Sequence, residues 1–343
     1  MSETEDPEAP ATPPKRPRRV TAQDVATAAD VSRSAVSRAF TPGAYLDAAK
    51  RELVLRTALQ LGYRPNALAA SLQGARTNLV GIIAGDIGNQ YDSELVAHLV
   101  ARLNEADKWP LVLGGAEAVT EQSVMSVLSY PLDALIVRGG SIDTALFSNC
   151  AKLNIPVIFS GRVVEGPFID SVCCRNAEGT ARAVDLLLAR GRRRFGFIGG
   201  PAAWSSVQER LAGVERQLAR AGLPLIVRCE ADYRFAGGSN ATRGMLAQHP
   251  LDAIICANDA MALGALSVAR NEAGRSVPED LSIIGFDDVT LAAWPDFNLT
   301  TLRNPQARTV TELLRLLDAR LTDPEKPSET VLIDPILMER GTH

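Results

Sequence analysis

Histidine and paired cysteine are scarce in this sequence, and the scarcity excludes two classes of site. The 343 residues include 3 histidines and 5 cysteines, and no cysteine belongs to a Cys-x-x-Cys pair. An odd number of unpaired cysteines predicts neither a disulfide framework nor a zinc site. We therefore expect core thiols in a reducing compartment, with no metal and no other cofactor.

Membrane and secretion signals are absent as well. No stretch reaches the roughly 18 apolar residues that a membrane helix needs. The first residues lack the basic, then apolar, then small-residue order of a secretory signal. We therefore expect a cytoplasmic protein without a membrane partner.

The common catalytic motifs are also missing. The sequence contains no Gly-x-Ser-x-Gly, no His-Glu-x-x-His, no Gly-x-Gly-x-x-Gly and no P-loop. Its histidines, His98, His249 and His343, form no plausible dyad, so acid–base chemistry would rest on carboxylates such as Asp287. An enzyme stays open as an alternative because two-lobed α/β folds host many chemistries, but we do not expect one.

Charge is distributed unevenly along the chain. The formal net charge is −4, but residues 15–76 carry eleven basic and four acidic side chains, which is a net charge of +7. Residues 1–14 carry −4 and residues 77–343 carry −7. A compact basic segment followed by an acidic body indicates a polyanionic partner for the first part.

Residues 1–18 lack apolar periodicity and predict a disordered arm, whereas residues 19–64 predict three short helices. Each helix has its own cap residue at its start. Thr21, paired with Asp24 in a capping box, begins the first helix, Ser32 the second and Asp47 the third, which Gly62 ends. We expect inward-facing residues at Val25 and Ala28, at Val36 and Phe40, and at Val54, Ala58 and Leu61.

The second of these helices carries a polar, basic face. Arg33, Ser34, Ser37 and Arg38 lie at helical spacing opposite the apolar residues. This face is typical of a small DNA-binding head, although a solvated face that binds nothing is the alternative. Residues 65–76 then predict a hinge helix, capped by Asn66, of about eight residues, which is too short to be stable unless something supports it.

From residue 77 onward, apolar runs alternate with helix-compatible sequence. The runs are LVGIIA, PLVLG, ALIVR, PVIFS, RFGFIGG, LPLIVR, AIICA and SIIGF. This alternation predicts parallel sheets in a doubly wound α/β core of two lobes. We expect the first lobe over about 77–175 plus 303–332 and the second over about 176–302 plus 333–343. Ligands of such sheets bind outside the carboxyl ends of strands, where Asn258, Asp259 and Asp287 stand.

Seven segments together resemble the lactose-repressor (LacI/GalR) family of bacterial regulators. They are VTAQDVATAADVSRSAVSRAF, LGYRPNALAASLQG, RTNLVGII, GPAAWSSVQERLAG, CANDAMALGAL, VPEDLSIIGFDD and LTTLRNP. The resemblance implies a helix-turn-helix head on a core similar to periplasmic binding proteins. It implies a nucleoid-associated bacterial repressor that binds double-stranded palindromic operator DNA as a homodimer and senses a small-molecule effector. A periplasmic solute-binding protein is the other alternative, but it has no use for a basic head.

The resemblance also implies which residues meet DNA. Arg33 and Ser34 would read base edges, while Ser37 and Arg38 would contact phosphate and base. Leu72 would be inserted between base steps in the minor groove, unless it packs under the core instead. The full set that we expect at DNA is Thr21, Arg33, Ser34, Ser37, Arg38, Tyr45, Asn66, Ala67 and Leu72.

For the effector, the resemblance implies hydrogen bonds from Asn258 and Asp287, an approach by Arg210 and an aromatic wall at Tyr233. Each residue has a structural alternative: Asp259 as a helix cap, Tyr233 as lobe packing, Arg210 as an ion pair. The full set that we expect at the effector is Tyr91, Asp92, Arg138, Arg162, Arg210, Tyr233, Asn258 and Asp287.

Three departures from the family pattern carry information. Asp30 stands where the helix-turn-helix turn usually has glycine, and we expect it to adopt the left-handed conformation. Arg138 replaces a neutral polar residue, and Gly161 replaces an aspartate that commonly binds sugar hydroxyls. With Arg162 and Arg210 nearby, these changes favour an acidic effector such as a sugar acid or sugar phosphate.

The expected mechanism is a population shift. Effector binding would change the orientation of the lobes and hence the distance between the hinge segments of a dimer. Whether the effector induces or corepresses stays open. No heptad repeat follows the core, so we expect dimers and not tetramers.

Overall fold

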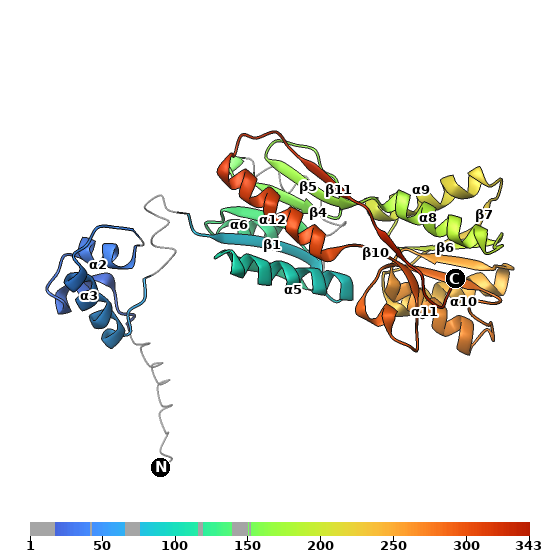
Figure 1. Ribbon diagram of the computed structural model, residues 1–343, viewed down its shortest axis with the longest axis horizontal. Coiled ribbons are helices and arrows are strands. Elements are labelled where there is room, and N and C mark those ends of the chain that lie inside the picture. The colour runs from blue at the N-terminus through green and yellow to red at the C-terminus, as the bar shows by residue number, and fades with distance from the viewer. Residues whose placement is uncertain (1–17, 42, 66–75, 116–118, 139–149, 151) are drawn as a thin grey trace, which may run out of the picture. The chain divides into compact units, whose positions relative to one another are not determined.

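The structure is a computed structural model that describes residues 18–41, 43–65, 76–115, 119–138, 150 and 152–343. The chain divides into two compact units, Met1–Thr77 and Asn78–His343, and each is described by itself (Figure 1). The predicted arm, apart from Arg18, and the predicted hinge residues Asn66, Ala67 and Leu72 lie outside the described residues.

The described part of the first unit contains three helices, α1 (Ala22–Ala28), α2 (Arg33–Phe40) and α3 (Ala48–Leu61). All three predicted caps are confirmed: Thr21 and Asp24 form a capping box, Ser32 caps α2, and Asp47 begins α3. Asp30 adopts φ 48° in the turn between α1 and α2, as its replacement of glycine predicts.

The small core of this unit confirms Val25, Val36, Val54 and Ala58 as buried residues, but two predictions about its packing were wrong. Ala28 is exposed, because the inward stripe of α1 runs through Val25, Ala26 and Ala29. Leu61 is exposed because Gly62 ends α3 in the left-handed conformation and reverses the chain. Tyr63 then packs against Phe40 in its place, with ring centroids 5.8 Å apart.

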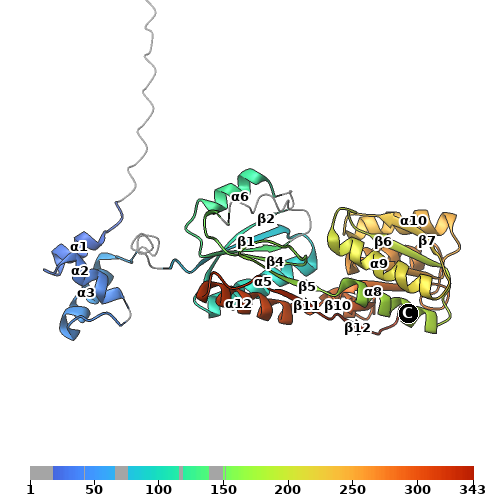
Figure 2. The ribbon, with the colours of Figure 1, turned by 90° about the horizontal axis from the view of Figure 1, so that it is seen from above.

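The second unit contains two six-stranded sheets in its described part. The first has the order β11-β5-β4-β3-β1-β2 and is parallel throughout. Its strands are β1 (Leu79–Asp86), β2 (Trp109–Gly115), β3 (Ala134–Arg138), β4 (Val157–Ser160), β5 (Ile169–Cys174) and β11 (Thr330–Ile333). In Figure 2, α6 (Glu121–Leu128) covers one face and α5 (Gln90–Glu105) and α12 (Gln306–Thr322) cover the other.

The second sheet has the order β12-β10-β9-β8-β6-β7 and is parallel except for the antiparallel pair β10–β12. Its strands are β6 (Phe195–Gly199), β7 (Leu225–Glu230), β8 (Ala253–Cys256), β9 (Ser282–Asp287), β10 (Thr300–Arg303) and β12 (Ile336–Met338). Its helices are α8 (Asn176–Ala189), α9 (Ser205–Arg220), α10 (Phe235–Gln248), α11 (Asp259–Asn271) and the 3-10 turn η2 (Thr290–Ala293).

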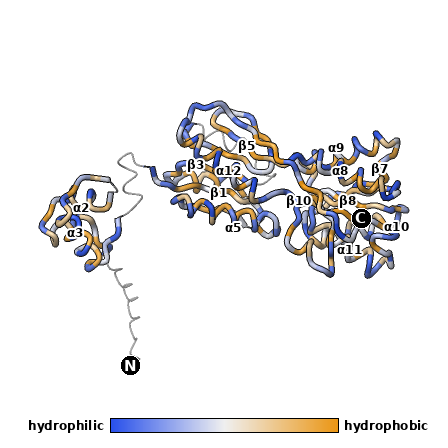
Figure 3. Tube along the Cα trace, in the orientation of Figure 1, coloured by the Kyte–Doolittle hydropathy of each residue, from blue (hydrophilic) through white to orange (hydrophobic). Residues whose placement is uncertain are grey.

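Eight apolar runs were predicted as strands and all eight form strands, whereas β5, β10, β11 and β12 were not predicted. Polar residues reduce the apolar run in β5, through Asp170 and Ser171, and in β10, through Thr300 and Thr301, while β11 and β12 are only four and three residues long. Figure 3 shows the predicted strands as hydrophobic segments inside each lobe. None of the helices in the described part of the chain combines the length and apolar character that crossing a bilayer demands.

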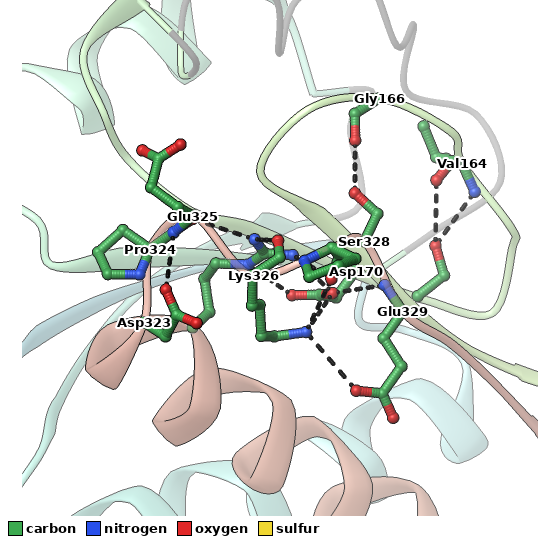
Figure 4. Close-up of polar contacts among 12 residues, drawn as sticks. Val164, Gly166, Asp170, Asp323, Pro324, Glu325, Lys326, Ser328 and Glu329 are labelled. Carbon is green, nitrogen blue, oxygen red and sulfur yellow. Dashed lines mark hydrogen bonds and ion pairs between the residues drawn. The ribbon is translucent and has the colours of Figure 1, made fainter.

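The chain passes between the two sheets three times, from β5 to α8, from β10 to α12 and from β11 to β12. A buried ion pair anchors the second of these segments. Arg320 near the end of α12 donates to both carboxylate oxygens of Asp170 on β5, at 3.0 and 2.9 Å. Lys326 Nζ (2.9 Å) and the Glu329 backbone N–H (2.8 Å) complete the shell around that carboxylate (Figure 4). Both carboxylate oxygens thus accept hydrogen bonds, so the pair fixes α12 against the first sheet.

Candidate DNA-binding face and effector cavity

The outward face of α2 is polar and basic, as predicted. Arg33, Ser34, Ser37 and Arg38 are exposed, while Ala35, Val36 and Ala39 are buried. Ser32 Oγ accepts from the Ala35 backbone N–H at 3.2 Å and lies 2.8 Å from Ser34 Oγ. The cap therefore fixes the first turn of the helix, which carries the two residues predicted to read bases.

Thr21 and Tyr45, the other described residues predicted at DNA, flank this face in sequence. The Thr21 hydroxyl donates to Asp24 at 2.7 Å, and Arg18 pairs with the same carboxylate at 2.8 Å. The hydrogen bond from the Thr21 backbone N–H is the main cause that lowers the pKa of Asp24 to about 2. Tyr45 is 92% exposed, so its side chain is accessible to a partner.

Arg51 of α3 holds the loop before Tyr45 in place. Its guanidinium donates to the carbonyl of Ala39 at 2.7 Å and to that of Ala44 at 2.6 Å. The loop between α2 and α3 therefore depends on a side chain twelve residues away from Ala39, a link that the sequence pattern did not indicate.

In the second unit, a cavity of about 40 Å³ is lined by residues from both lobes. The lining residues are Tyr91, Arg138, Ser160, Gly161, Val172, Cys173, Cys174, Asn176, Ser206, Arg210, Asn304 and Thr309. Three of them, Tyr91, Arg138 and Arg210, were predicted at the effector. The space suffices for a few water molecules, and Arg138 and Arg210 occupy its two sides.

Arg138 fills the first-lobe side of this cavity. Its Nε donates to Asp92 at 2.7 Å, its Nη1 donates to the Ser160 carbonyl at 3.3 Å, and its guanidinium lies 5.2 Å from the centre of the Tyr91 ring. Gly161 has φ 93°, and a Cβ there would overlap the Arg138 guanidinium. The departures at positions 138 and 161 are therefore coupled, because the Arg138 guanidinium occupies the space that a side chain at position 161 would fill.

Arg210 of α9 fills the second-lobe side and is 6% exposed. Its Nε donates to Asn176 Oδ1 at 2.9 Å, its Nη1 donates to the Ala257 carbonyl, and its guanidinium lies 3.6 Å from the Phe286 ring centre. Its Nη2 lies 3.8 Å from Asp287 Oδ1, which is a loose ion pair. Burial raises the pKa of Asp287 to about 7, against the opposing effect of Arg210.

Asp287 ends β9 with φ 112°, and Asp288 follows at φ 58°. Two consecutive non-glycine residues in this region store backbone strain, which is typical of functional sites. Asp288 is held by Arg303 at 2.7 Å and by Arg340 at 2.6 Å. Asp259 is buried beside them and accepts from the Val289 N–H and from Thr301, and burial raises its pKa well above the usual range.

Five predicted effector residues are not among the described residues that line the cavity. Asp92 and Asp287 contact the two lining arginines. Asn258 caps α11 by accepting from the Met261 N–H at 3.0 Å, so it and not Asp259 is the cap residue. Tyr233 stacks on Trp204 with centroids 5.0 Å apart, and Arg162 lies over the Phe159 ring at 4.9 Å. Arg162 thereby reaches the other side of the first sheet, where Phe159 belongs to a separate apolar cluster.

Sequence reasoning missed several lining residues, namely Ser160, Cys173, Cys174, Asn176, Ser206, Asn304 and Thr309. Ser160 ends β4 and Cys174 ends β5, so the rule about carboxyl ends of strands applies to both. That rule could have found Ser160 from the predicted run PVIFS. It could not find the cysteines, because β5 was not recognised as a strand.

Comparisons with known proteins agree with this architecture. Residues 21–66 match the family described as bacterial regulatory proteins, lacI family, and residues 184–343 match the periplasmic binding protein-like domain. The HTH-type transcriptional repressor PurR of Erwinia tasmaniensis is 31% identical over 328 residues, which cover 93% of this chain and 96% of that protein. The chain belongs to the LacI family.

Two further proteins similar to this LacI-family protein are also repressors. The probable HTH-type transcriptional repressor ExuR of Bacillus subtilis is 27% identical over 94% of this chain and 98% of its own length. The crystal structure of the Lac repressor dimer bound to operator and the anti-inducer ONPF has a TM-score of 0.85 and 28% identity, covering 95% of this chain and 99% of that one. This LacI-family protein is a DNA-binding transcriptional regulator with the two-lobed core of that fold.

Proposed function

We propose that this regulator represses transcription as a homodimer on a palindromic operator and that a small anionic metabolite, bound in the cavity between the lobes, controls its affinity for DNA. The observation that carries the proposal is the cavity, because residues of both lobes line one site with the buried Arg210–Asp287 pair at its edge. A ligand that touches both lobes alters their relative orientation.

The present cavity is too small for a sugar, and this supports the link between binding and motion. A site for a small metabolite occupies about 300 Å³ or more, against about 40 Å³ here. Entry of an effector therefore requires the arginine side chains or the lobes to move apart. That movement is the means by which the effector changes the spacing of the two DNA-binding heads in a dimer.

The charges of the two cavity arginines favour an acidic effector. Arg138 has a close carboxylate partner in Asp92 at 2.7 Å, whereas the nearest carboxylate of Arg210 is 3.8 Å away. Asp287 is also half neutral near pH 7 because burial raises its pKa to about 7. Arg210 is therefore the group with unused capacity to bind a carboxylate or phosphate, and a sugar acid or sugar phosphate supplies one.

The direct test is the selection of genomic DNA fragments by the full-length protein, with and without a panel of neutral sugars, sugar acids and sugar phosphates. We expect palindromic fragments whose recovery changes with one acidic compound. Recovery that changes only with a neutral sugar would refute the anionic effector, and recovery of no palindrome would refute the mode of DNA binding.

The affinity for an acidic effector should depend on pH. Protonation of Asp287 removes a negative charge next to Arg210, so the affinity for a sugar acid should rise severalfold as the pH falls from 8 to 6. Calorimetric titrations at several pH values measure this. Asp287→Asn should make the affinity independent of pH over this range. A neutral sugar that donates a hydrogen bond to ionised Asp287 should instead bind more weakly as the pH falls.

Arg33 should determine one position of the operator. It lies exposed in the first turn of α2, where a guanidinium can pair bidentately with a guanine edge. Arg33→Ala should relax base preference at one position per half-site and weaken binding to the selected operator by about 1–3 kcal/mol. Fluorescence anisotropy on operators changed one base pair at a time measures both effects. Arg56→Ala, on an exposed position of α3, is the control and should alter all sequences equally.

A further inference from the structure

A second, larger cleft lies where the chain passes between the two sheets. Its volume is about 660 Å³, within the range of about 300–1,000 Å³ that small-molecule sites occupy. The segment that leaves β10 for α12 and the segment that leads from β11 into β12 form most of its wall. The lining residues are Arg182, Arg303, Pro305, Gln306, Ala307, Arg308, Asp334, Pro335, Ile336 and Leu337.

The lining of this cleft has a net positive charge. Three arginines line it against one carboxylate, that of Asp334, which lies 3.5 Å from Arg175 and 3.9 Å from Arg182. Arg303 pairs with Asp288 at 2.7 Å. Arg308 is exposed in the first turn of α12 and forms no ion pair with any residue in the described part of the chain. The cleft therefore has an excess of cationic groups that an anion would complement.

Two further features of the lining define the shape of such an anion. α12 is 17 residues long and begins after Pro305 without a side-chain cap, and the residues of its first turn, Gln306, Ala307 and Arg308, all line the cleft. Beside them lie apolar side chains, among which Ile336 is 49% exposed. The combination suits a molecule with a doubly charged phosphate at one end and an apolar body at the other.

One chain segment, residues 303–309, contributes lining residues to both the cleft and the effector cavity. Asn304 and Thr309 line the effector cavity, while Arg303, Pro305 and Arg308 line the cleft. Gln306 connects the segment to the first lobe by donating to the Tyr91 carbonyl at 3.4 Å and to Glu94 at 3.3 Å. A ligand in the cleft therefore contacts the segment on which the orientation of the lobes depends.

We propose that this cleft, lined by Arg182, Arg303 and Arg308 at the crossover between the lobes, is a second ligand site that binds a small organic phosphate with an apolar body. The site is separate from the effector cavity, and its existence does not require that the cavity bind an anionic effector. The phosphate bound in the cleft biases the orientation of the lobes. By linkage, it changes the affinity for the effector by the same factor as the effector changes the affinity for the phosphate.

The test uses phenyl phosphate as the probe and the full-length protein. Calorimetry should show binding of phenyl phosphate, with phenol and inorganic phosphate each binding at least tenfold more weakly. Arg308→Gln should weaken binding about tenfold, because one charge-assisted contact is lost. The control Arg216→Gln removes an exposed arginine of α9 outside the cleft and should leave the affinity unchanged.

Hydrogen exchange distinguishes the cleft from the effector cavity. Phenyl phosphate should slow exchange of the backbone N–H groups at residues 306–308 and 336–337. Protection confined to residues 160–161 and 173–176, or binding that Arg308→Gln does not weaken, would overturn the proposal. Absence of binding at millimolar phenyl phosphate would overturn it as well. Absence of binding, or binding that Arg308→Gln does not weaken, would leave effector binding by the cavity untouched, whereas protection confined to residues 160–161 and 173–176 would place an anion in the effector cavity and so support that site instead.

Discussion

Replacement of Arg210 by methionine should abolish the response to effector while the protein still binds operator DNA. Methionine keeps much of the length of the side chain but removes its charge, leaving Asp287 buried without a cationic partner. Truncation of one member of a buried charged pair at a binding site costs about 2–5 kcal/mol, or about 30-fold to several thousandfold in affinity. Calorimetry with the effector and anisotropy with operator DNA measure the two properties separately.

Two variants control this experiment. Arg216→Met changes an exposed arginine on the same helix and should leave both affinities unchanged. The double variant Arg210→Met, Asp287→Asn removes both charges and should recover stability but not effector affinity. If Arg210→Met bound the effector within twofold of the parent protein, Arg210 would be only a structural residue and the proposed site would be wrong.

The substitution Asp170→Asn should destabilise the core by about 3–5 kcal/mol, because it leaves the buried Arg320 guanidinium without its counter-charge. The neighbouring cation Lys326 loses the closer of its two carboxylate partners and keeps only Glu329, at 3.6 Å. Urea unfolding followed by circular dichroism measures the loss as a lower midpoint. A midpoint shifted no more than that of the control variant would show that α12 is held by apolar packing alone.

The control for Asp170 is an exposed ion pair. Arg243 and Glu272 lie 2.6 Å apart with about half of each side chain exposed, so water screens the pair and Glu272→Gln should leave the urea midpoint almost unchanged. The buried pair also predicts a pH effect. The cations around Asp170 outweigh burial and hold its pKa below the usual value, so its contribution is complete above about pH 4 and is lost as the pH falls further.

The helix-turn-helix unit could be predicted closely from the sequence because its signals are local. The side chains of Thr21, Ser32 and Asp47 each bond a backbone N–H three residues away, and Asp30 adopts its left-handed conformation within a single residue. The positions that failed, Ala28 and Leu61, depend on how the helices pack together. A shift of one residue on a helix turns a side chain by about 100°, which is enough to expose it.

The effector cavity could be predicted only in outline. The rule about strand ends led to Asn258 and Asp287, yet Asn258 serves as the cap of α11 and Asp287 lies behind Arg210. Of the three arginines grouped by the sequence, Arg138 and Arg210 meet in one cavity while Arg162 turns to Phe159. Successive side chains along an extended chain point to opposite faces of the sheet. Arg162 therefore does not reach the cavity, although it follows Gly161 directly in the sequence.

The sequence by itself therefore determined the helix caps, the eight apolar strands, the basic first segment and the family, since each depends on neighbouring residues or on order along the chain. The tertiary structure alone decided which side chains share a cavity. Arg138 and Gly161 fit together because β3 and β4 are adjacent in the sheet, and Arg210 meets Asp287 because α9 and β9 lie in one lobe. The arginine-lined cleft at the crossover likewise exists only because two segments about thirty residues apart in sequence lie side by side.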